Sequence, residues 1–239
     1  MTAVDGSARA AALRRNLVLA ALAPSPPPAA PLELELVRLD HHDVVHETGQ
    51  PTAAALFPLT CVVSIAARNG ADALDVTTVG CEGLVGLSGL LGADVHDTDA
   101  VCRVPGEALR LPIAAARQLL TDDNAGLAVL HRYVRSTIAH LMQRTACTRA
   151  HSSEARCASW LLRTSDRVGA DAFELSHATL ATMLGVRRAT VSDSLSLLQR
   201  NGVVRSTRGT VTVLARSALQ TAACSCYATL HRAPPATSA

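Results

Sequence analysis

Two adjacent arginines, Arg187 and Arg188, follow Gly185 and Val186 at the predicted start of an amphipathic helix. A guanidinium presents N–H donors in a planar fork that matches phosphate oxygens and guanine edges. The first turn of a helix also favours anions, because its N–H groups have no partner inside the helix. These residue types at this position predict an anion-binding site, and the rest of the chain has to indicate which anion.

The arginine pair lies inside a predicted helix-turn-helix within residues 175–214. Ser176 can cap a first helix, Gly185 permits a tight turn, and Asn201 with Gly202 ends a second helix. Helical spacing places three apolar residues of the second helix on one face, which we expect to be buried: Val191, Leu195 and Leu198.

The opposite face of this second helix carries small and polar side chains, so its backbone can approach a groove closely. Residues 203–214 predict a two-stranded wing with a basic turn that touches a phosphate backbone. From Leu175 to Leu214, five arginines oppose one acid, Asp193, which itself lies on the second helix. The sequence therefore predicts double-stranded DNA as the anion, with contacts from Arg187, Arg188, Ala189, Thr190, Ser192, Ser196 and Arg208.

Charge is divided unevenly along the 239 residues. Residues 1–126 hold 8 arginines and 15 acids, for a net charge of −7, whereas residues 127–239 hold 14 arginines and 5 acids, for +9. This asymmetry favours a C-terminal half that meets a polyanion and an N-terminal half that does not.

Residues 32–112 are predicted to form an antiparallel barrel or sandwich, after a helix at 8–23 and a Pro-rich connector. LELELVRL alternates strictly, so we expect Leu32, Leu34 and Leu36 to share the buried face of a strand. Strand-like runs follow between turn residues, and Asn69-Gly70 predicts a hairpin. These runs are residues 61–67, 73–79, 100–104 and 108–112.

A long helix is predicted from about Thr121 to Thr148, and another from Ser152 or Ser153 to Val168. The apolar seam of the long helix recurs on average every 3.5 residues, which is typical of a helix paired with a copy of itself. The alternative is that the seam covers the barrel. The predicted dimer seam comprises Leu127, Leu130, Val134, Ile138 and Leu141.

The stretches LATMLGVRRATVSDSLSLLQRNGVV, FPLTCVVSIAARNG, TVGCEGLVGLSGLLG and VPGEALRLP resemble the cyclic-AMP receptor protein and FNR (Crp/Fnr) family of bacterial transcription regulators. The resemblance implies an α+β chain with an N-terminal helix and connector at 1–31 and a cyclic-nucleotide-binding-like, cupin-type antiparallel β-roll at 32–120. A dimerisation helix at 121–150 and a winged helix-turn-helix at 151–239 would follow. It further implies a cytoplasmic, non-enzymatic homodimer on pseudo-palindromic DNA, with RNA polymerase as a candidate partner.

Members of this family that bind cyclic nucleotides use a Gly-Glu pair for the ribose and an Arg followed by a small residue for the phosphate. The corresponding residues here are Gly86 and Leu87, then Asp97 and Thr98. Leu87 offers no acceptor to a ribose hydroxyl, and Asp97 repels a phosphate. We therefore expect no response to cyclic AMP; the effector, if one exists, is left open.

The seven cysteines are odd in number and show neither C-x-x-C spacing nor paired Cys/His tetrads, so no metal site or cofactor is predicted. Cys224 and Cys226 stand two apart on an expected helix and should not face each other. A buried structural role is favoured for them over a thiol switch. A separate hypothesis makes the chain a redox sensor through Cys61, Cys81 or Cys102.

His41, His42 and His46 in HHDVVH allow a second alternative, a cupin-type enzyme that binds a metal or small molecule and carries an accessory helix-turn-helix. Solvated or hydrogen-bonded histidines at a turn are the preferred interpretation. Arg14 and Arg15 precede an apolar run that is short for an export signal, and no run approaches the ~20 apolar residues of a membrane span.

Overall fold

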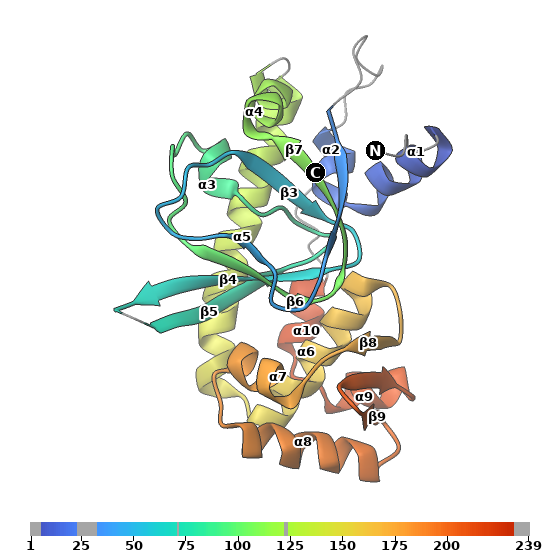
Figure 1. The fold of residues 1–239 in the computed structure, drawn as a ribbon. Helices are drawn as coiled ribbons and strands as arrows, with labels where there is room; N and C mark the ends of the chain where they lie inside the picture. The colour runs from blue at the N-terminus through green and yellow to red at the C-terminus, as the bar shows by residue number, and fades with distance from the viewer. Residues whose placement is uncertain (1–5, 23–32, 71, 122–123, 232–239) are drawn as a thin grey trace.

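The computed structural model describes residues 6–22, 33–70, 72–121 and 124–231. It shows an α+β chain in which a β-roll is followed by a long helix, α5 (Asn124–Ala150), and then by a winged helix. Figure 1 shows α5 running beside the β-roll and down to the winged helix. Among the described helices none is long and apolar enough to span a membrane. The Pro-rich segment at 24–31 lies outside the described residues.

The β-roll consists of two antiparallel sheets, with strand orders β1-β7-β3 and β2-β6-β4-β5. The predicted hairpin at Asn69-Gly70 is confirmed, because β4 and β5 pair antiparallel on either side of it. The bounds are β1 Glu35–Leu39, β2 Val44–His46, β3 Ala54–Pro58, β4 Val62–Asn69, β5 Asp72–Val79, α3 Leu87–Leu90, β6 Asp99–Val104 and β7 Gly106–Pro112.

Strand β1 differs from its prediction in start and orientation. It begins at Glu35, and Leu36 is 42% exposed instead of buried. Val37 and Leu39 pack against the β-roll core, so the opposite set of residues faces inward, and Leu34, just before the strand, joins the core that includes the helices. Leu32 is outside the described residues. The alternation of leucine and glutamate predicts a strand with two different faces. It does not specify which face the rest of the β-roll will cover.

The predicted helix at 8–23 is two helices, α1 (Gly6–Arg15) and α2 (Leu17–Leu22), separated at Asn16. The Asn16 Oδ1 atom accepts from the Leu19 amide (2.9 Å), as an N-cap does, so a new helix begins there. Its Nδ2 atom donates to the carbonyls of Pro58 (2.9 Å) and Gly83 (2.8 Å). These bonds fasten α2 onto the β-roll through a fully buried amide.

The long helix begins at Asn124, and a separate helix, α4 (Ile113–Thr121), precedes it. On α5 the Tyr133 hydroxyl accepts from the Leu84 amide and donates to the Leu84 carbonyl, both at 3.1 Å. A Cβ atom at Gly83 would lie 2.7 Å from that hydroxyl, so glycine permits the approach. Burial raises the pKa of Tyr133 to about 12, which keeps the phenol neutral and able to donate. The helix is thus fixed to the β-roll along its first half.

The winged helix matches the prediction closely. Its elements are α6 (Ser153–Val168), β8 (Ala172–Glu174), α7 (His177–Leu184), α8 (Arg188–Arg200), β9 (Val204–Thr207), β10 (Thr210–Val213), α9 (Arg216–Ala222) and α10 (Cys226–His231). Ser152 caps α6 and Ser176 caps α7, each through its hydroxyl. Trp160 is 2% exposed and lies in a core that also includes Val62 and Val104 of the β-roll. The two parts therefore share apolar contacts.

Arg167, near the end of α6, connects the winged helix to the β-roll by polar contacts as well. Its guanidinium donates to both carboxylate oxygens of Glu82, at 2.6 and 3.1 Å, and to the hydroxyl and carbonyl of Thr78. A Cβ atom at Gly80 would lie 2.5 Å from the Arg167 side chain, so this glycine leaves room for it. The bidentate geometry favours a fixed orientation of α6.

Candidate nucleic-acid interface and cavity

Helix α8 presents the predicted basic face to solvent. Its apolar stripe is buried, with Val191, Leu195 and Leu198 between 1% and 2% exposed. Figure 1 shows α8 at the end of the molecule away from the β-roll, with α7 between them. Arg187, Arg188 and Ala189 are exposed, whereas Thr190, Ser192 and Ser196 are half-buried on the same helix, and Asp193 is exposed.

The first turn of α8 combines backbone donors with guanidiniums. Gly185 adopts φ 64° and ends α7, which turns the chain sharply into α8. Arg187 is the N-cap residue, and its side chain makes no capping hydrogen bond. An anion placed here would meet unpaired N–H groups, the positive end of the helix dipole and two arginines.

A histidine that was not singled out from the sequence holds this region together. His177, the first residue of α7, places Nδ1 at 3.0 Å from the Ser192 hydroxyl and Nε2 at 3.3 Å from the Ser206 hydroxyl. Ser192 also donates to the Arg188 carbonyl, at 3.1 Å. One imidazole therefore bridges the two helices and the wing, and it fixes Ser192 on the exposed face.

The predicted wing is present, and a third strand, β8, extends its sheet in the order β8-β10-β9. Arg208 and Gly209 form the turn, with φ 49° and 81°. Arg208 is exposed at the tip, beyond the last paired residues Thr207 and Thr210. The wing therefore carries an exposed cation at its tip.

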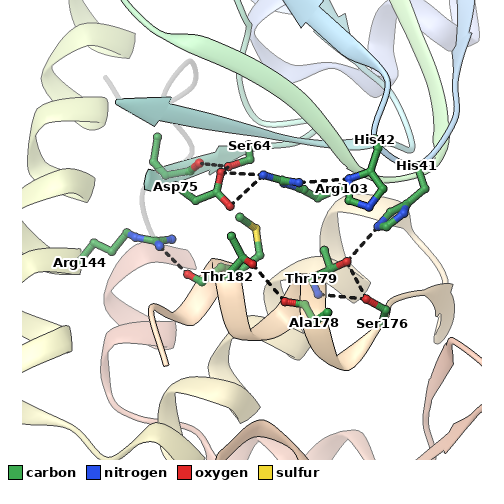
Figure 2. A network of polar contacts seen from close by, with 12 residues as sticks. His41, His42, Ser64, Asp75, Arg103, Arg144, Ser176, Ala178, Thr179 and Thr182 are labelled. Carbon is green, nitrogen blue, oxygen red and sulfur yellow. Dashed lines mark hydrogen bonds and ion pairs between the residues drawn. The ribbon is translucent and has the colours of Figure 1, made fainter. Parts of the chain in front are cut away.

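Helix α7 is held against the β-roll and α5 by the polar contacts drawn in Figure 2. His41 Nε2 lies 3.0 Å from the Thr179 hydroxyl, and Arg144 of α5 donates to the Met183 carbonyl at 2.8 Å. Burial and the nearby charges of His42 and Arg103 lower the pKa of His41, so the docked arrangement favours the neutral imidazole.

The four residues predicted for an effector pocket, Gly86, Leu87, Asp97 and Thr98, line one cavity of about 410 Å³ in the β-roll. The rest of its wall is mainly aliphatic, and α5 contributes Tyr133, Thr137 and Leu141. No arginine is among the described residues that line it. Arg103 instead forms an ion pair with Asp75 (3.2 Å) and lies between Asp75 and His42 in Figure 2.

His46 also lines this cavity and stacks on His96, with ring centroids 3.5 Å apart. Burial, reinforced by the His96 charge, lowers the pKa of His46 to about 4. At neutral pH the imidazole is therefore uncharged, and Asp97 is the charged residue of the lining.

The three histidines of HHDVVH do not converge. His41 contacts Thr179, His42 lies at a turn with φ 75° beside Arg103, and His46 stacks inside the roll. His41 and His42 agree with hydrogen-bonded histidines at a turn, whereas His46 is buried at the end of β2, and the arrangement gives no support to a cupin-type metal centre. For the redox hypothesis, burial raises the pKa of Cys61 and Cys102 to about 12 and also raises that of Cys81, which suppresses the reactive thiolate.

The expectation that Cys224 and Cys226 face apart is wrong. Cys224 precedes α10 and Cys226 is the first residue of that helix, so helical spacing does not separate their side chains. Both sulfurs lie within 4.8 Å of each other, of the Cys147 sulfur and of a His151 ring nitrogen.

The predicted dimer seam on α5 is only partly exposed in the single chain. Leu127, Ile138 and Leu141 are 43%, 49% and 37% exposed, and Val134 is half-buried. Leu130 is 4% exposed within the core of the β-roll and helices. At this position the single chain agrees with the alternative that the seam covers the barrel.

Comparison with known families identifies residues 155–222 as a Crp-like helix-turn-helix domain. This span runs from α6 through α9 and includes α7, α8 and the wing. The segment predicted from the arginine pair thus matches a Crp-like helix-turn-helix domain by sequence.

Solved structures with the same fold extend the likeness to the rest of the chain. FixK2 from Bradyrhizobium japonicum is 16% identical, with a TM-score of 0.68 over 81% of this chain and 99% of its own. A CRP-family transcriptional regulator from Thermus thermophilus is 18% identical, with a TM-score of 0.64 over 78% and 96%. The c-di-GMP-responsive global regulator CLP of Xanthomonas campestris is 19% identical, with a TM-score of 0.57 over 75% and 93%. A search of curated protein sequences gave no match.

Proposed function

We propose that this chain, which carries a Crp-like helix-turn-helix domain on the fold of Crp/FNR transcription regulators, binds specific DNA sequences as a homodimer. The observation that carries the proposal is the solvent-facing start of α8, where Arg187 and Arg188 flank unpaired backbone donors. Helix α8 enters the major groove, and Arg208 of the wing contacts the adjacent backbone.

The face of α8 suits a groove because its central side chains are short. Ala189, Ser192 and Ser196 let the helix backbone lie close to base edges, while the guanidinium of Arg188 reaches O6 and N7 of guanine. Asp193 is exposed on the same helix and disfavours a phosphate directly opposite it. Base contacts are therefore concentrated in the first two turns of α8.

Dimerisation is proposed through the exposed part of the α5 seam. Leu127, Val134 and Leu141 recur every seven residues, Ile138 lies four residues after Val134, and all but half-buried Val134 remain exposed in one chain. A second copy of α5 would cover them and relate the two α8 helices by a two-fold axis. Contacts with RNA polymerase and a cytoplasmic location stay predictions.

The β-roll cavity is proposed as the place where an effector acts on the dimer. Leu141 belongs both to the cavity wall and to the proposed seam, so a molecule in the cavity touches the interface helix directly. The largely aliphatic wall, with Asp97 as its charged residue, favours an uncharged or cationic apolar molecule over an anion.

Selection of bound fragments from random double-stranded DNA tests the proposed function. Two α8 helices related by a two-fold axis should occupy successive major grooves about 34 Å apart, so the enriched site should be pseudo-palindromic with half-sites one helical turn apart. Footprinting on the enriched site should protect both half-sites. Protection of a single asymmetric half-site at saturating protein would contradict the dimer, and no enrichment at all would contradict DNA recognition.

Cyclic AMP is expected to leave DNA affinity unchanged within about twofold. A ligand raises DNA affinity only if it binds the DNA-competent conformation of the protein more tightly than the other conformation, which requires favourable contacts in the cavity. The cavity offers Leu87 where a ribose acceptor is needed and Asp97 where a cation is needed, and Arg103 is engaged with Asp75 outside it. Calorimetry with cyclic AMP and DNA titrations with and without the nucleotide measure both steps. Micromolar binding together with a tenfold gain in DNA affinity, about 1.4 kcal/mol, would show that the cavity accepts the nucleotide.

A further inference from the structure

Three segments far apart in the sequence bring cysteine and histidine side chains together beside the winged helix. Cys147 lies in the last turn of α5, His151 lies between α5 and α6, and Cys224 and Cys226 lie where α10 begins. Their four ligand atoms, three sulfurs and one ring nitrogen, all lie within 4.8 Å of one another. Among the described residues this is the one group of such side chains close enough to share an ion.

The separations fit a single tetrahedral ion. The Cys147 and Cys224 sulfurs are 3.6 Å apart, and the Cys226 sulfur is 3.5 Å from His151 Nδ1. Zinc–sulfur bonds of about 2.3 Å and zinc–nitrogen bonds of about 2.0–2.1 Å place neighbouring tetrahedral ligands about 3.5–3.8 Å apart. The three cysteines also border an adjoining cavity of about 30 Å³.

Neighbouring polar groups are placed to orient the sulfur ligands. Gln143 Nε2 donates to the Cys226 sulfur at 3.1 Å, and the Ser159 hydroxyl lies 3.0 Å from the Cys224 sulfur. Ser159 accepts from the Cys224 amide at 3.0 Å and donates its own proton to the Ala155 carbonyl at 2.9 Å, which fixes the chain just before α10. The hydrogen bond from Gln143 to the Cys226 sulfur is of the kind that stabilises a coordinating thiolate in metal sites. Cys224 and Cys226 are themselves 6% and 3% exposed.

The residues around the cluster carry positive charge, which favours an anionic group at the cluster. Arg144, Arg156 and Arg163 line the small cavity, and no carboxylate is among the described residues that line it. Burial, with the charges of Arg167 and Arg144, lowers the pKa of Arg163 to about 9, so it stays cationic at neutral pH. A divalent ion with three thiolates and a neutral imidazole carries a net charge of −1, which offsets part of this buried positive charge.

We propose that Cys147, His151, Cys224 and Cys226 bind one Zn²⁺ ion in a closed, structural site. Soft thiolate ligands with one imidazole in tetrahedral geometry select zinc over the hard cations Mg²⁺ and Ca²⁺. With four protein ligands no position is left for a substrate, so the ion fixes structure and does not catalyse. It ties the end of α5, the α5–α6 junction and α10 to one point, and thereby fixes the winged helix relative to α5. The proposal does not depend on DNA binding.

Metal analysis of the full chain, purified without an affinity tag under reducing conditions and dialysed against a mild chelator, tests the site. Wild type should retain about one zinc per chain, and Cys226→Ser and His151→Ala should retain about tenfold less or lower still. Cys81→Ser, which removes a half-buried thiol in the β-roll, serves as the matched control and should match wild type.

Cobalt titration of metal-free wild type keeps the test independent of how well the variants fold. Tetrahedral cobalt–thiolate absorption that saturates at one ion per chain, and that zinc displaces, is the expected result. Absence of stoichiometric zinc together with absence of this absorption would overturn the proposal. A Cys147–Cys224 disulfide in the non-reduced, freshly purified protein, found by peptide mapping in place of the metal, would overturn it as well and would make the cluster a redox site.

Discussion

Ile138→Arg is expected to convert the dimer to a monomer and to lower affinity for the pseudo-palindromic site by about 100-fold or more. Binding of the second half-site is intramolecular when two winged helices are joined, and joining two modules raises affinity by roughly 10²–10⁴-fold without any new contact. A charged residue at the centre of an apolar seam cannot be buried against its two-fold copy without a large desolvation cost. Loss of the dimer therefore appears mainly as loss of DNA affinity.

Ile138 is the best probe of the interface because its side chain contributes little to the packing of the single chain. Its side chain is 49% exposed near the middle of the seam, so the substitution should leave each chain folded. Leu130, at 4% exposure, would report on the core instead, since truncating a buried leucine costs about 2–5 kcal/mol of unfolding free energy.

Sedimentation of the variant without DNA measures its oligomeric state, and titration on the full site and on an isolated half-site measures affinity. Leu36→Arg is the matched control, because Leu36 is an apolar residue of similar exposure on β1, which pairs with β7 and not with α5. The control should remain dimeric and bind normally. An Ile138→Arg protein that sediments as a dimer and keeps full-site affinity would place the interface elsewhere.

The parts of the fold that were predictable are those whose cause is local. Ser152 and Ser176 cap their helices through an amide three residues away, and Gly185 ends α7 by adopting a positive φ. Asn69-Gly70 closes a hairpin between strands that are adjacent in sequence. In each case the interacting groups are only a few residues apart, so one short segment of sequence is enough to predict the helix end or the hairpin.

The candidate interface was predictable for the same reason. Val191, Leu195 and Leu198 define the buried side of α8 by their spacing, and the opposite side follows geometrically. His177 was missed because its role depends on two hydroxyls 15 and 29 residues away, one on α8 and one in the wing. The residues next to a histidine at the first position of a helix do not indicate whether it will make such long-range contacts.

Long-range docking explains the remaining differences. The Asn16 side chain reaches carbonyls 42 and 67 residues away, so a helix break there follows from the position of the β-roll and not from helix propensity. Cys147 and Cys224 are 77 residues apart and meet only because α10 packs against α5 and α6. Spacing rules for metal sites recognise ligands paired on one short loop, and here three separate segments supply them.

Arg188→Ala is expected to lower affinity for the selected site by about 5- to 150-fold, or 1–3 kcal/mol, and to relax specificity at the base pair it contacts. Arg188 is the first residue of α8 and is exposed. Arg208 lies at the tip of the wing, where we propose a backbone contact. Its removal should weaken binding to all sequences about equally and reduce the salt dependence, because one phosphate contact is lost.

Arg208→Asn is preferable to alanine for this comparison, because asparagine tolerates the φ of 49° at the turn and the loss is then confined to the charge. Arg38→Ala removes an equally cationic but highly exposed side chain from the β-roll and controls for net charge. Affinities for the selected site and for single-base variants, measured over a range of salt concentrations, separate base readout from backbone contact. Equal loss of specificity from Arg188→Ala and Arg208→Asn, or an unchanged sequence preference in Arg188→Ala, would show that base recognition does not reside at the start of α8.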